Sequence, residues 1–484
     1  LAIADVNAQA SVIASQHAWP SRPEPNTDPD FKNMPNPGLV TPGSLLSCQV
    51  LRTREYQSCP RIAPHSRSLR FTMTLLGRLQ EGKKQIRLII TLCFLFYIIS
   101  FLTYTYNLPA FTYTQEATSP SLRQTSPTKP ENVTVSALVF YGRRSRVETM
   151  KCYIERNMVD NGGWLDEVLW VVNTDKNDDL RYLEELMASN PRYKKIHPDE
   201  MVATYTYKHI WKLLDRGKYY VKIDDDVVWI DDDAIPNMVT RKIQNPNDFV
   251  VSGNIINNPP LGFFHMRMGA IHPYFPERFE PLDINITSEG DYWKPSGHPA
   301  WEGPKKFKWE LNKEPPPWEN HRWLRVPDDG VLYQTPAAEL KYDIWGDSYK
   351  NWAIASQMHM SLFENIEKNQ LDLYKFEKPW VMYDDRIRIN FMCIYSDDIL
   401  DTDPENWPKE KGDEDMIVLE LPKKLRRPVV IQGNALAAHY QYMDQGKLKT
   451  TDILPRYYSL AADRYCLGGD AFRATGQEMK ARSN

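Results

Sequence analysis

Three consecutive aspartates, Asp224, Asp225 and Asp226, are the residues of this chain best suited to chemistry. They follow Tyr219-Tyr-Val-Lys-Ile223, a β-branched and aromatic run that predicts a buried strand. In an extended chain, residues two apart share a face, so Asp224 and Asp226 are expected to point together and Asp225 to point away. Two neighbouring carboxylates repel each other unless a cation lies between them, so the pattern predicts a bound cation.

Oxygen ligands favour a hard divalent ion, so the expected cofactor is Mn²⁺ or Mg²⁺. Such an ion keeps some of its waters and binds phosphates of a substrate, which predicts a metal–diphosphate site. The alternative interpretation of an acidic run is a solvated loop tip. A structural role is favoured for the next run, Asp231-Asp-Asp233, because it precedes an expected helix at Ala234 and supplies a helix cap and negative charge.

The segments around the aspartates alternate between strand and helix patterns. We expect strands at 133–141, 167–172 and 219–223, and helices at about 147–159, 180–188 and 205–214. Strands separated by helices predict a parallel sheet with crossover helices. Ligands of such sheets bind beyond the carboxyl ends of the strands, which is where the aspartates are expected to lie.

The composition of the 484 residues is that of a globular protein, with 25% charged and 42% hydrophobic residues. A net charge of -4 argues against a basic surface for nucleic acid, so no nucleic-acid partner is expected. Cys152, Cys393 and Cys466 follow the apolar segment described next, and an odd number allows at most one pair among them. Their pairing does not follow from the sequence.

Residues 87–107 are predicted to cross a membrane once, because no charged residue occurs from Leu88 to Gln115 and a span needs about 20 residues. Basic residues precede this run, whereas the first one after it is Arg123. This bias predicts a type II anchor with a cytosolic N-terminus and a luminal C-terminal bulk. A cleaved signal peptide is the alternative. Sequons at Asn132 and Asn285 both lie on the side expected to be luminal.

With this topology, the segment Tyr220-Val-Lys-Ile-Asp-Asp-Asp-Val-Val-Trp-Ile-Asp-Asp-Asp-Ala-Ile-Pro236 resembles the metal-dependent GT-A-fold glycosyltransferases with an Asp-x-Asp motif. It also looks like a group of fungal type II membrane members of that class. The resemblance implies an α/β fold with a GT-A-like, Rossmann-like, mostly parallel sheet flanked by helices. Irregular insertions and one preceding transmembrane helix complete the expected architecture.

Five elements of the GT-A fold can be matched in order from Val133 to Tyr440. The resemblance implies a set of nucleotide-binding residues: Arg143, Asp175, Asp224, Asp225 and Gly253. It implies a metal site made of Asp224, Asp226 and His439. It implies a catalytic base in the segment Gly412-Asp413-Glu414-Asp415, namely Asp415 with Glu414. Two assignments keep alternatives, since the glycine loop could be at Gly262 and the later acidic site at Asp397-Asp398.

The expected layout has six parts: a disordered cytosolic tail at 1–86, a transmembrane signal anchor at 87–107, a Ser/Thr/Pro-rich stem at 108–131, a half that binds the nucleotide-sugar donor at 132–260, an acceptor-binding and catalytic half at 261–440, and a C-terminal extension at 441–484. Five tryptophans between Tyr292 and Trp323 are either an acceptor platform or buried pins of an irregular insertion.

The resemblance implies transfer of a sugar from a nucleoside-diphosphate sugar to a glycan, glycoprotein or glycolipid acceptor in the secretory-pathway lumen. The expected location is the Golgi or endoplasmic reticulum membrane. Two other functions are the alternatives: a nucleotidyltransferase, and a luminal carbohydrate-binding protein without turnover. We expect Asp226→Ala to abolish metal-dependent transfer and to leave the thermal midpoint nearly unchanged.

Overall fold

The computed structural model describes residues 91, 93–98, 127–198, 206–281, 286–287 and 290–466, and every structural statement below refers to these. The chain divides into two units, residues 1–117 and 118–484. The predicted tail at 1–86 and most of the predicted anchor at 87–107 lie outside the described residues. Of the predicted anchor, residues 91 and 93–98 are described, and they are helical and exposed. Among the described helices, none combines the length and the apolar character needed to cross a membrane.

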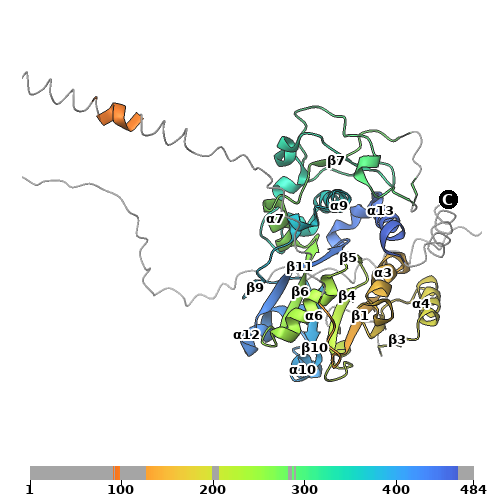
Figure 1. Cartoon of the computed structure of the whole chain (residues 1–484). Coiled ribbons are helices and arrows are strands. Elements are labelled where there is room, and N and C mark those ends of the chain that lie inside the picture. The colour runs from red at the N-terminus through yellow and green to blue at the C-terminus, as the bar shows by residue number, and fades with distance from the viewer. Residues whose placement is uncertain are drawn as a thin grey trace, which may run out of the picture. The chain divides into compact units, whose positions relative to one another are not determined.

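A mixed sheet of nine strands forms the centre of the second unit (Figure 1). Its strands are β1 (Val135–Tyr141), β2 (Glu167–Val172), β3 (Tyr193–Ile196), β4 (Tyr219–Asp224), β5 (Val227–Ile230), β6 (Val250–Ile256), β9 (Trp380–Met382), β10 (Phe391–Tyr395) and β11 (Val429–His439). Their order is β3-β2-β1-β4-β10-β6-β11-β5, and β9 pairs with β11. β1 is buried along its whole length, as its continuous apolar run requires.

The predicted parallel arrangement is confirmed for the first half of the sheet, where β1 pairs in parallel with β2 and β4, and β2 with β3. The second half is mixed, because β10 lies antiparallel between β4 and β6. β11 pairs in parallel with β6 and antiparallel with β5 and β9. The strands β5, β9 and β10 thus run opposite to the others, and the sheet is mostly parallel.

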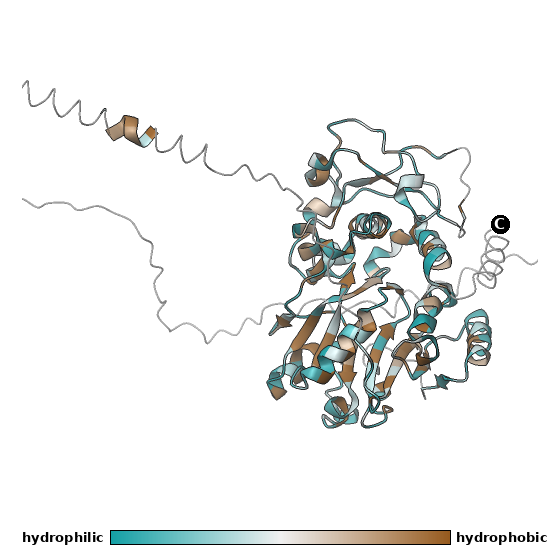
Figure 2. Ribbon diagram, viewed as in Figure 1, coloured by the Kyte–Doolittle hydropathy of each residue, from teal (hydrophilic) through white to brown (hydrophobic). Residues whose placement is uncertain are grey.

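Helices pack around the sheet, and Figure 2 shows hydrophobic residues concentrated on its strands. The α-helices are α3 (Arg144–Asn157), α4 (Asn177–Ser189), α5 (Lys208–Trp211), α6 (Ala234–Gln244), α7 (Pro259–Arg267), α8 (Asp347–Lys350), α9 (Trp352–Glu367), α10 (Ser396–Leu400), α11 (Asp413–Asp415), α12 (Leu421–Leu425) and α13 (Ile453–Leu460). The expected helix at 205–214 is the single turn α5, and β3 was not expected. Asp233 is the residue before α6, but its side chain makes no capping hydrogen bond to this helix.

The helix α9 contacts β6 of the main sheet and also a small second sheet formed by β7 (Tyr274–Pro276) and β8 (Trp323–Arg325). All of its residues except the last are buried, so it is an internal helix of this unit. The insertion that precedes it is held by buried indoles. Trp309, Trp323 and Trp352 pack with ring centroids 5.7 to 5.9 Å apart.

Those tryptophans therefore pin the insertion, as the second interpretation of the sequence held. Four of the five, Trp293, Trp301, Trp309 and Trp323, are at most 8% exposed, so their faces are not open to a sugar, whereas Trp318 is half-buried. A disulfide joins Cys152 in α3 to Cys466 and closes a loop of 314 positions. It gives the cysteine pairing that does not follow from the sequence. Cys393 is a free, buried cysteine in β10.

Candidate functional site

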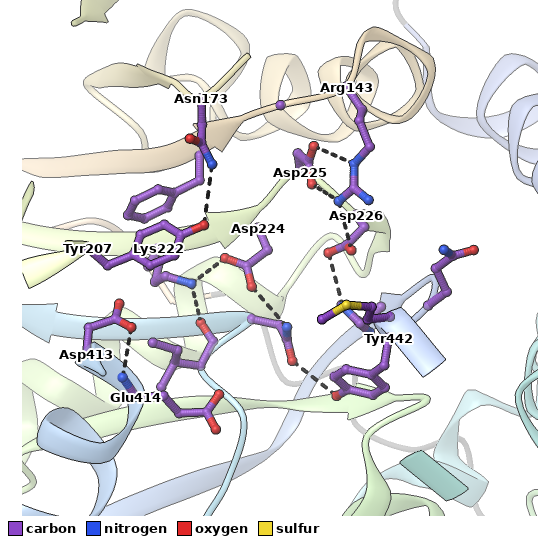
Figure 3. Close-up of a pocket in the computed structure, with 17 residues that line it drawn as sticks. Arg143, Asn173, Tyr207, Lys222, Asp224, Asp225, Asp226, Asp413, Glu414 and Tyr442 are labelled. Atoms are coloured by element: carbon purple, nitrogen blue, oxygen red, sulfur yellow. Dashed lines mark hydrogen bonds and ion pairs between the residues drawn. The ribbon is translucent and has the colours of Figure 1, made fainter. Parts of the chain in front are cut away.

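A pocket of about 490 Å³ lies where the carboxyl ends of β1 and β4 meet the end of β11 and the start of α11. Seventeen residues line it: Phe140, Gly142, Arg143, Asn173, Tyr207, Lys222, Asp224, Asp225, Asp226, Ile389, Asn390, Asp413, Glu414, His439, Gln441, Tyr442 and Met443. Figure 3 shows these side chains converging from the different elements. The predicted position of the ligand beyond the strand ends thus coincides with a real cavity.

Asp224 is the last residue of β4, and Asp225 and Asp226 form the turn between β4 and β5. The expected geometry is wrong here, because the chain does not stay extended but reverses at Asp225 and Asp226. As a result, Asp225 does not point away from Asp226: both carboxylates face Arg143 (Figure 3). Asp224 instead faces a separate set of partners. The turn residues themselves carry no glycine or proline, which is why the run reads as continuous strand.

Arg143 follows β1 and binds the two turn carboxylates together. Its Nε donates to Asp225 Oδ2 at 2.9 Å, and its Nη2 donates to Asp225 Oδ1 and, at 3.1 Å, to Asp226 Oδ2. The adjacent Gly142 makes this approach possible, since a Cβ there would lie only 3.0 Å from Asp225 Oδ2. Burial raises the pKa of Asp225 although Arg143 opposes that shift. Arg143 lines the pocket, and its role in nucleotide binding stays a prediction.

Asp226 has two further partners, Arg146 and His439. Arg146 Nη1 donates to Asp226 Oδ2 at 3.1 Å, and Nε2 of His439 lies 3.1 Å from Asp226 Oδ1. Burial alone would raise the pKa of Asp226, but the attraction of His439 and the two arginines outweighs it and holds the pKa well below its usual range. Asp226 is therefore an ionised carboxylate in a buried position, as a metal ligand must be.

The strand pairing explains why two residues so distant in the sequence meet. His439 is the last residue of β11 and pairs with Val227, the first residue of β5. The next residue, Tyr440, donates its backbone N–H to Asp226 O at 2.8 Å. The register of β11 on β5 therefore fixes the imidazole beside the carboxylate, and no local sequence pattern carries that information.

The donor atoms of Asp226 and His439 fit a divalent ion. Asp226 Oδ1 and His439 Nε2 lie in direct hydrogen-bond contact at 3.1 Å, and a carboxylate and a neutral imidazole are both ligand types that a divalent ion accepts. Among the described residues, no group of three or more His, Cys, Asp and Glu side chains is arranged to hold a metal ion. A cation held by this pair would thus need waters and phosphate oxygens as its other ligands.

Asp224 is held apart from that pair. Its carboxylate accepts from Lys222 Nζ and from Asn390 Nδ2, the latter at 2.9 Å. Tyr442 OH donates to Asn390 Oδ1 at 3.2 Å, which extends the network along the pocket floor. No described contact joins Asp224 to Asp226 or His439, so the structure does not bring the three predicted metal ligands together. The cause is the turn, which separates residues that an extended chain would place on one face.

The acidic motif opens α11 and contributes two of its three side chains to the pocket. Asp413 and Glu414 line the cavity, whereas Asp415 does not and pairs with Arg386. Successive helical residues are rotated by about 100°, so three in a row cannot all face one pocket. Glu414 Oε1 accepts from Arg388 Nη1 at 2.9 Å. Of the two predicted catalytic residues, Glu414 alone therefore reaches the cavity wall.

Asp413 is a functional candidate that the sequence did not single out. It is buried, and its Oδ2 accepts from Trp211 Nε1 at 3.2 Å. Burial raises its pKa to about 6, against the opposing influence of Lys222 and of that hydrogen bond. A carboxyl group that titrates near neutrality inside a pocket is a frequent feature of functional sites. The only indication of its role in the sequence is its position within the acidic motif.

Comparisons with known proteins leave the family open. No family model and no curated protein matches the chain. Among solved structures, GalNAc-T7 with UDP, GalNAc and Mn²⁺ is similar at a TM-score of 0.31 and 11% identity, over 64% of this chain and 44% of that one.

Two further structures are similar over 25% of this chain. A 4-diphosphocytidyl-2C-methyl-D-erythritol synthase from Anaerococcus prevotii has a TM-score of 0.20 and 11% identity over 55% of its own length. A mycobacterial protein has a TM-score of 0.21 and 13% identity over 41% of its length. The chain thus spans about half the length of the structures it matches. These likenesses do not establish a family.

Two predicted nucleotide-binding residues lie away from the pocket. Asp175 is exposed, and the polar residue that reaches the cavity at the end of β2 is Asn173, whose Nδ2 lies 3.4 Å from Tyr207 OH. Gly253 lies inside β6, where a Cβ would be 2.5 Å from Phe391 Cδ1, so its role is packing against β10. The alternative Gly262 is likewise packed, against Met358.

Several pocket residues were missed because their types are common in ordinary cores and loops. Lys222 is only 3% exposed, and its Nζ donates to Ile389 O at 2.9 Å as well as to Asp224. Tyr207 packs edge-on against Phe140 with centroids 5.2 Å apart. In the sequence, Lys222 is noticeable as a charged residue inside an apolar strand run. No comparable pattern indicates that Tyr207 and Phe140 line a pocket.

Proposed function

We propose that the chain is a metal-dependent glycosyltransferase that moves a sugar from a nucleoside-diphosphate sugar to a carbohydrate-bearing acceptor. The observation that carries this proposal is the Asp226–His439 pair, 3.1 Å apart, in a pocket at the carboxyl ends of β1 and β4. Arg143 and Arg146 add positive charge beside the pair. Carboxylate, imidazole and guanidinium groups at one point suit a diphosphate and its counter-ion.

In this proposal, Mn²⁺ or Mg²⁺ is held by Asp226 and His439 and, when bound, supplies positive charge that stabilises the departing nucleoside diphosphate. Arg143 contributes to the same stabilisation by donating to phosphate oxygens, since its guanidinium is at the pocket wall. At the other end of the pocket, Tyr207 and Asn173 offer an aromatic ring and an amide to the nucleotide base. Asp224 can accept from the ribose hydroxyls.

Glu414 is proposed as the group that takes the proton of the acceptor hydroxyl in an inverting transfer. Its carboxylate lines the pocket and is held in place by Arg388 Nη1 at 2.9 Å. A proton acceptor must lie within hydrogen-bond reach of the reacting hydroxyl, and Asp415 faces Arg386 instead. Glu414→Gln should therefore lower the rate of transfer about 10²-fold or more and leave nucleotide binding largely intact.

A luminal location in the secretory pathway, with a type II anchor in the Golgi or endoplasmic reticulum membrane, is part of the proposal. The disulfide between Cys152 and Cys466 supports it, because such bonds persist in oxidising compartments. Asn132, in the first described sequon, is exposed as a glycosylated residue must be. Glycosidase treatment of the protein from its native host would detect the modification as a drop in mass.

The direct test incubates the full chain with UDP- and GDP-sugars, Mn²⁺ and a mixture of glycan acceptors. We expect a lengthened glycan and a free nucleoside diphosphate in equal amounts. In a parallel sample given a nucleoside triphosphate and a sugar 1-phosphate, release of pyrophosphate with formation of a nucleotide-sugar would identify a nucleotidyltransferase instead. Nucleotide binding without any turnover of a donor would favour the carbohydrate-binding alternative. Asp232→Asn is a matched control, since Asp232 is exposed and pairs with Arg156 outside the pocket.

A further inference from the structure

A cluster of aromatic rings and arginines adjoins the pocket at Tyr442. We call it the aromatic rim, and it consists of Trp345, Tyr349, Arg386, Arg388 and Tyr442. The ring of Tyr442 lies 4.3 Å from that of His439 and 4.9 Å from that of Tyr349. Tyr349 in turn packs edge-on against Trp345 with centroids 5.4 Å apart. The rim therefore forms a continuous path of rings from the Asp226–His439 pair toward the surface.

Arg388 is the centre of the aromatic rim. Its guanidinium carbon lies 4.2 Å from the ring centroid of Trp345 and 4.4 Å from that of Tyr349. The residue is only 7% exposed, and its Nε and Nη2 make no hydrogen bond to any described group. A buried cation with unpaired donors is costly, and the contacts of Arg388 with both rings and with Glu414 offset part of that cost.

Trp345 is the exposed end of the rim. Its side chain is 43% exposed, whereas most other tryptophans of the described residues are buried, Trp293 and Trp323 completely. An exposed indole beside a polar pocket is a candidate binding surface. Arg388 and Arg386 lie over its ring at 4.2 and 5.3 Å from the centroid, and the part of the indole that they leave exposed suits the apolar C–H face of a hexopyranose ring.

The net charge of the aromatic rim limits the class of sugar that it can bind. The two cations of the rim are already balanced by carboxylates, because Arg388 pairs with Glu414 and Arg386 pairs with both Glu414 and Asp415. The rim thus carries no excess positive charge for a phosphate, sulfate or uronic acid. It offers instead one apolar face and carboxylate oxygens that accept from hydroxyl groups. A neutral ring with several hydroxyls matches both features.

We propose that the aromatic rim is the acceptor subsite, and that Trp345 stacks on a neutral hexopyranose ring whose neighbouring hydroxyl reaches Glu414. This inference rests on the proposed function and adds the class of acceptor to it. Glu414 connects the pocket to the aromatic rim, since it lines the pocket and binds Arg388 of the rim. A sugar on Trp345 therefore lies next to the residue proposed to take its proton.

The test is saturation-transfer NMR on the full chain with UDP or GDP and Mg²⁺, which is diamagnetic and does not broaden the proton signals of the probes. The probes are three neutral disaccharides: methyl β-lactoside, methyl β-cellobioside and methyl α-mannobioside. We expect saturation on the C–H protons of one ring of at least one probe. Trp345→Ala should lower this signal by about tenfold, and Trp345→Phe should restore much of it, because a ring can still stack. Tyr333→Ala is the control, since Tyr333 is 71% exposed and lies outside the rim and the pocket.

Titration of UDP or GDP into nucleotide-free samples of the same chains separates a failure of the acceptor subsite from a failure of the donor site. Nucleotide affinity within about twofold of the wild type in Trp345→Ala, together with loss of the sugar signal, supports the acceptor subsite. An unchanged sugar signal in Trp345→Ala, or no signal from any probe with a wild-type chain that binds nucleotide, overturns it and leaves the donor site standing. A wild-type chain that binds neither UDP nor GDP overturns the proposed function itself.

Discussion

The carboxylate of Asp226 lies 3.1 Å from the imidazole Nε2 of His439, in a pocket formed where two halves of one sheet meet. The pair is created by the antiparallel register of β11 on β5 and not by any local motif. Arg143 and Arg146 face the same carboxylate. The site therefore brings one carboxylate, one imidazole and two guanidinium groups to a single point.

Arg143 should affect metal and nucleotide binding in opposite directions. Its guanidinium occupies the carboxylates of Asp225 and Asp226, so Arg143→Met removes a competitor for the cation. We expect Mn²⁺ alone to bind about tenfold tighter to this variant, and UDP or GDP with Mn²⁺ to bind about tenfold weaker, because a phosphate donor is lost. Calorimetric titrations of each ligand check this. Weaker binding of both would show that Arg143 only supports the turn.

Asp413 should make the protein less stable as the pH rises. The pKa of this carboxyl is raised by burial from 3.8 to about 6, so the folded state binds the proton more tightly than the unfolded state. Stability is then lost as the pH rises from about 4 through 6, and stays lower above that range. Asp413→Asn should be more stable than the wild type by about 2 to 3 kcal/mol at pH 7 and equal to it below pH 4. Urea unfolding across this pH range measures the stability of both proteins. A stability difference between Asp413→Asn and the wild type that does not depend on pH would contradict the prediction.

Gly253→Ala should destabilise the fold without a specific effect on the site. The added methyl would meet Phe391 Cδ1 at 2.5 Å, and overpacking of this kind costs about 1 to 3 kcal/mol. Gly446→Ala is the control, because a Cβ there has no neighbour within 4 Å. Chemical denaturation measures both variants. A Gly253→Ala chain that keeps its stability but loses nucleotide affinity would return this glycine to the binding site.

Removal of the Cys152–Cys466 bond should lower stability substantially, because the bond closes a loop of 314 positions in the unfolded chain. The expected loss for the double serine variant is about 5 kcal/mol, seen as a lower denaturation midpoint. A reductant should shift the wild type toward this variant and leave the variant itself unchanged. The same midpoint for both chains would mean that the bond does not form in solution.

The first half of the fold was predictable because its signals are local. The apolar runs that became β1, β2 and β4 are flanked by loops and helices, and their order implied a parallel sheet. The antiparallel strand β10 and the turn at Asp225 were not predictable, since they depend on pairing between distant segments. The same is true of Glu414 and Asp415, whose different directions follow from the orientation of one helical turn.

The surroundings of Asp226 also change one expectation from the sequence. An exposed metal ligand could be removed with little effect on the thermal midpoint. Asp226 is instead 8% exposed and bound to two arginines, so Asp226→Ala leaves the buried Arg146 without its carboxylate partner, while Arg143 keeps Asp225. Loss of one member of such a buried pair costs about 3 to 5 kcal/mol. Asp226→Asn, which keeps the shape and can still accept hydrogen bonds, is therefore the better variant for binding studies.

The central claim is that Asp226 and His439 hold a cation that neutralises a nucleoside diphosphate. Calorimetric titration of UDP and GDP into the full chain, with Mn²⁺ and then with a chelator, tests it most directly. We predict that Mn²⁺ tightens binding of one nucleotide by about tenfold or more in the wild type and in Asp232→Asn, and that Asp226→Asn removes this difference. Equal affinity with and without the metal in the wild type, or a metal effect that survives in Asp226→Asn, would contradict the account.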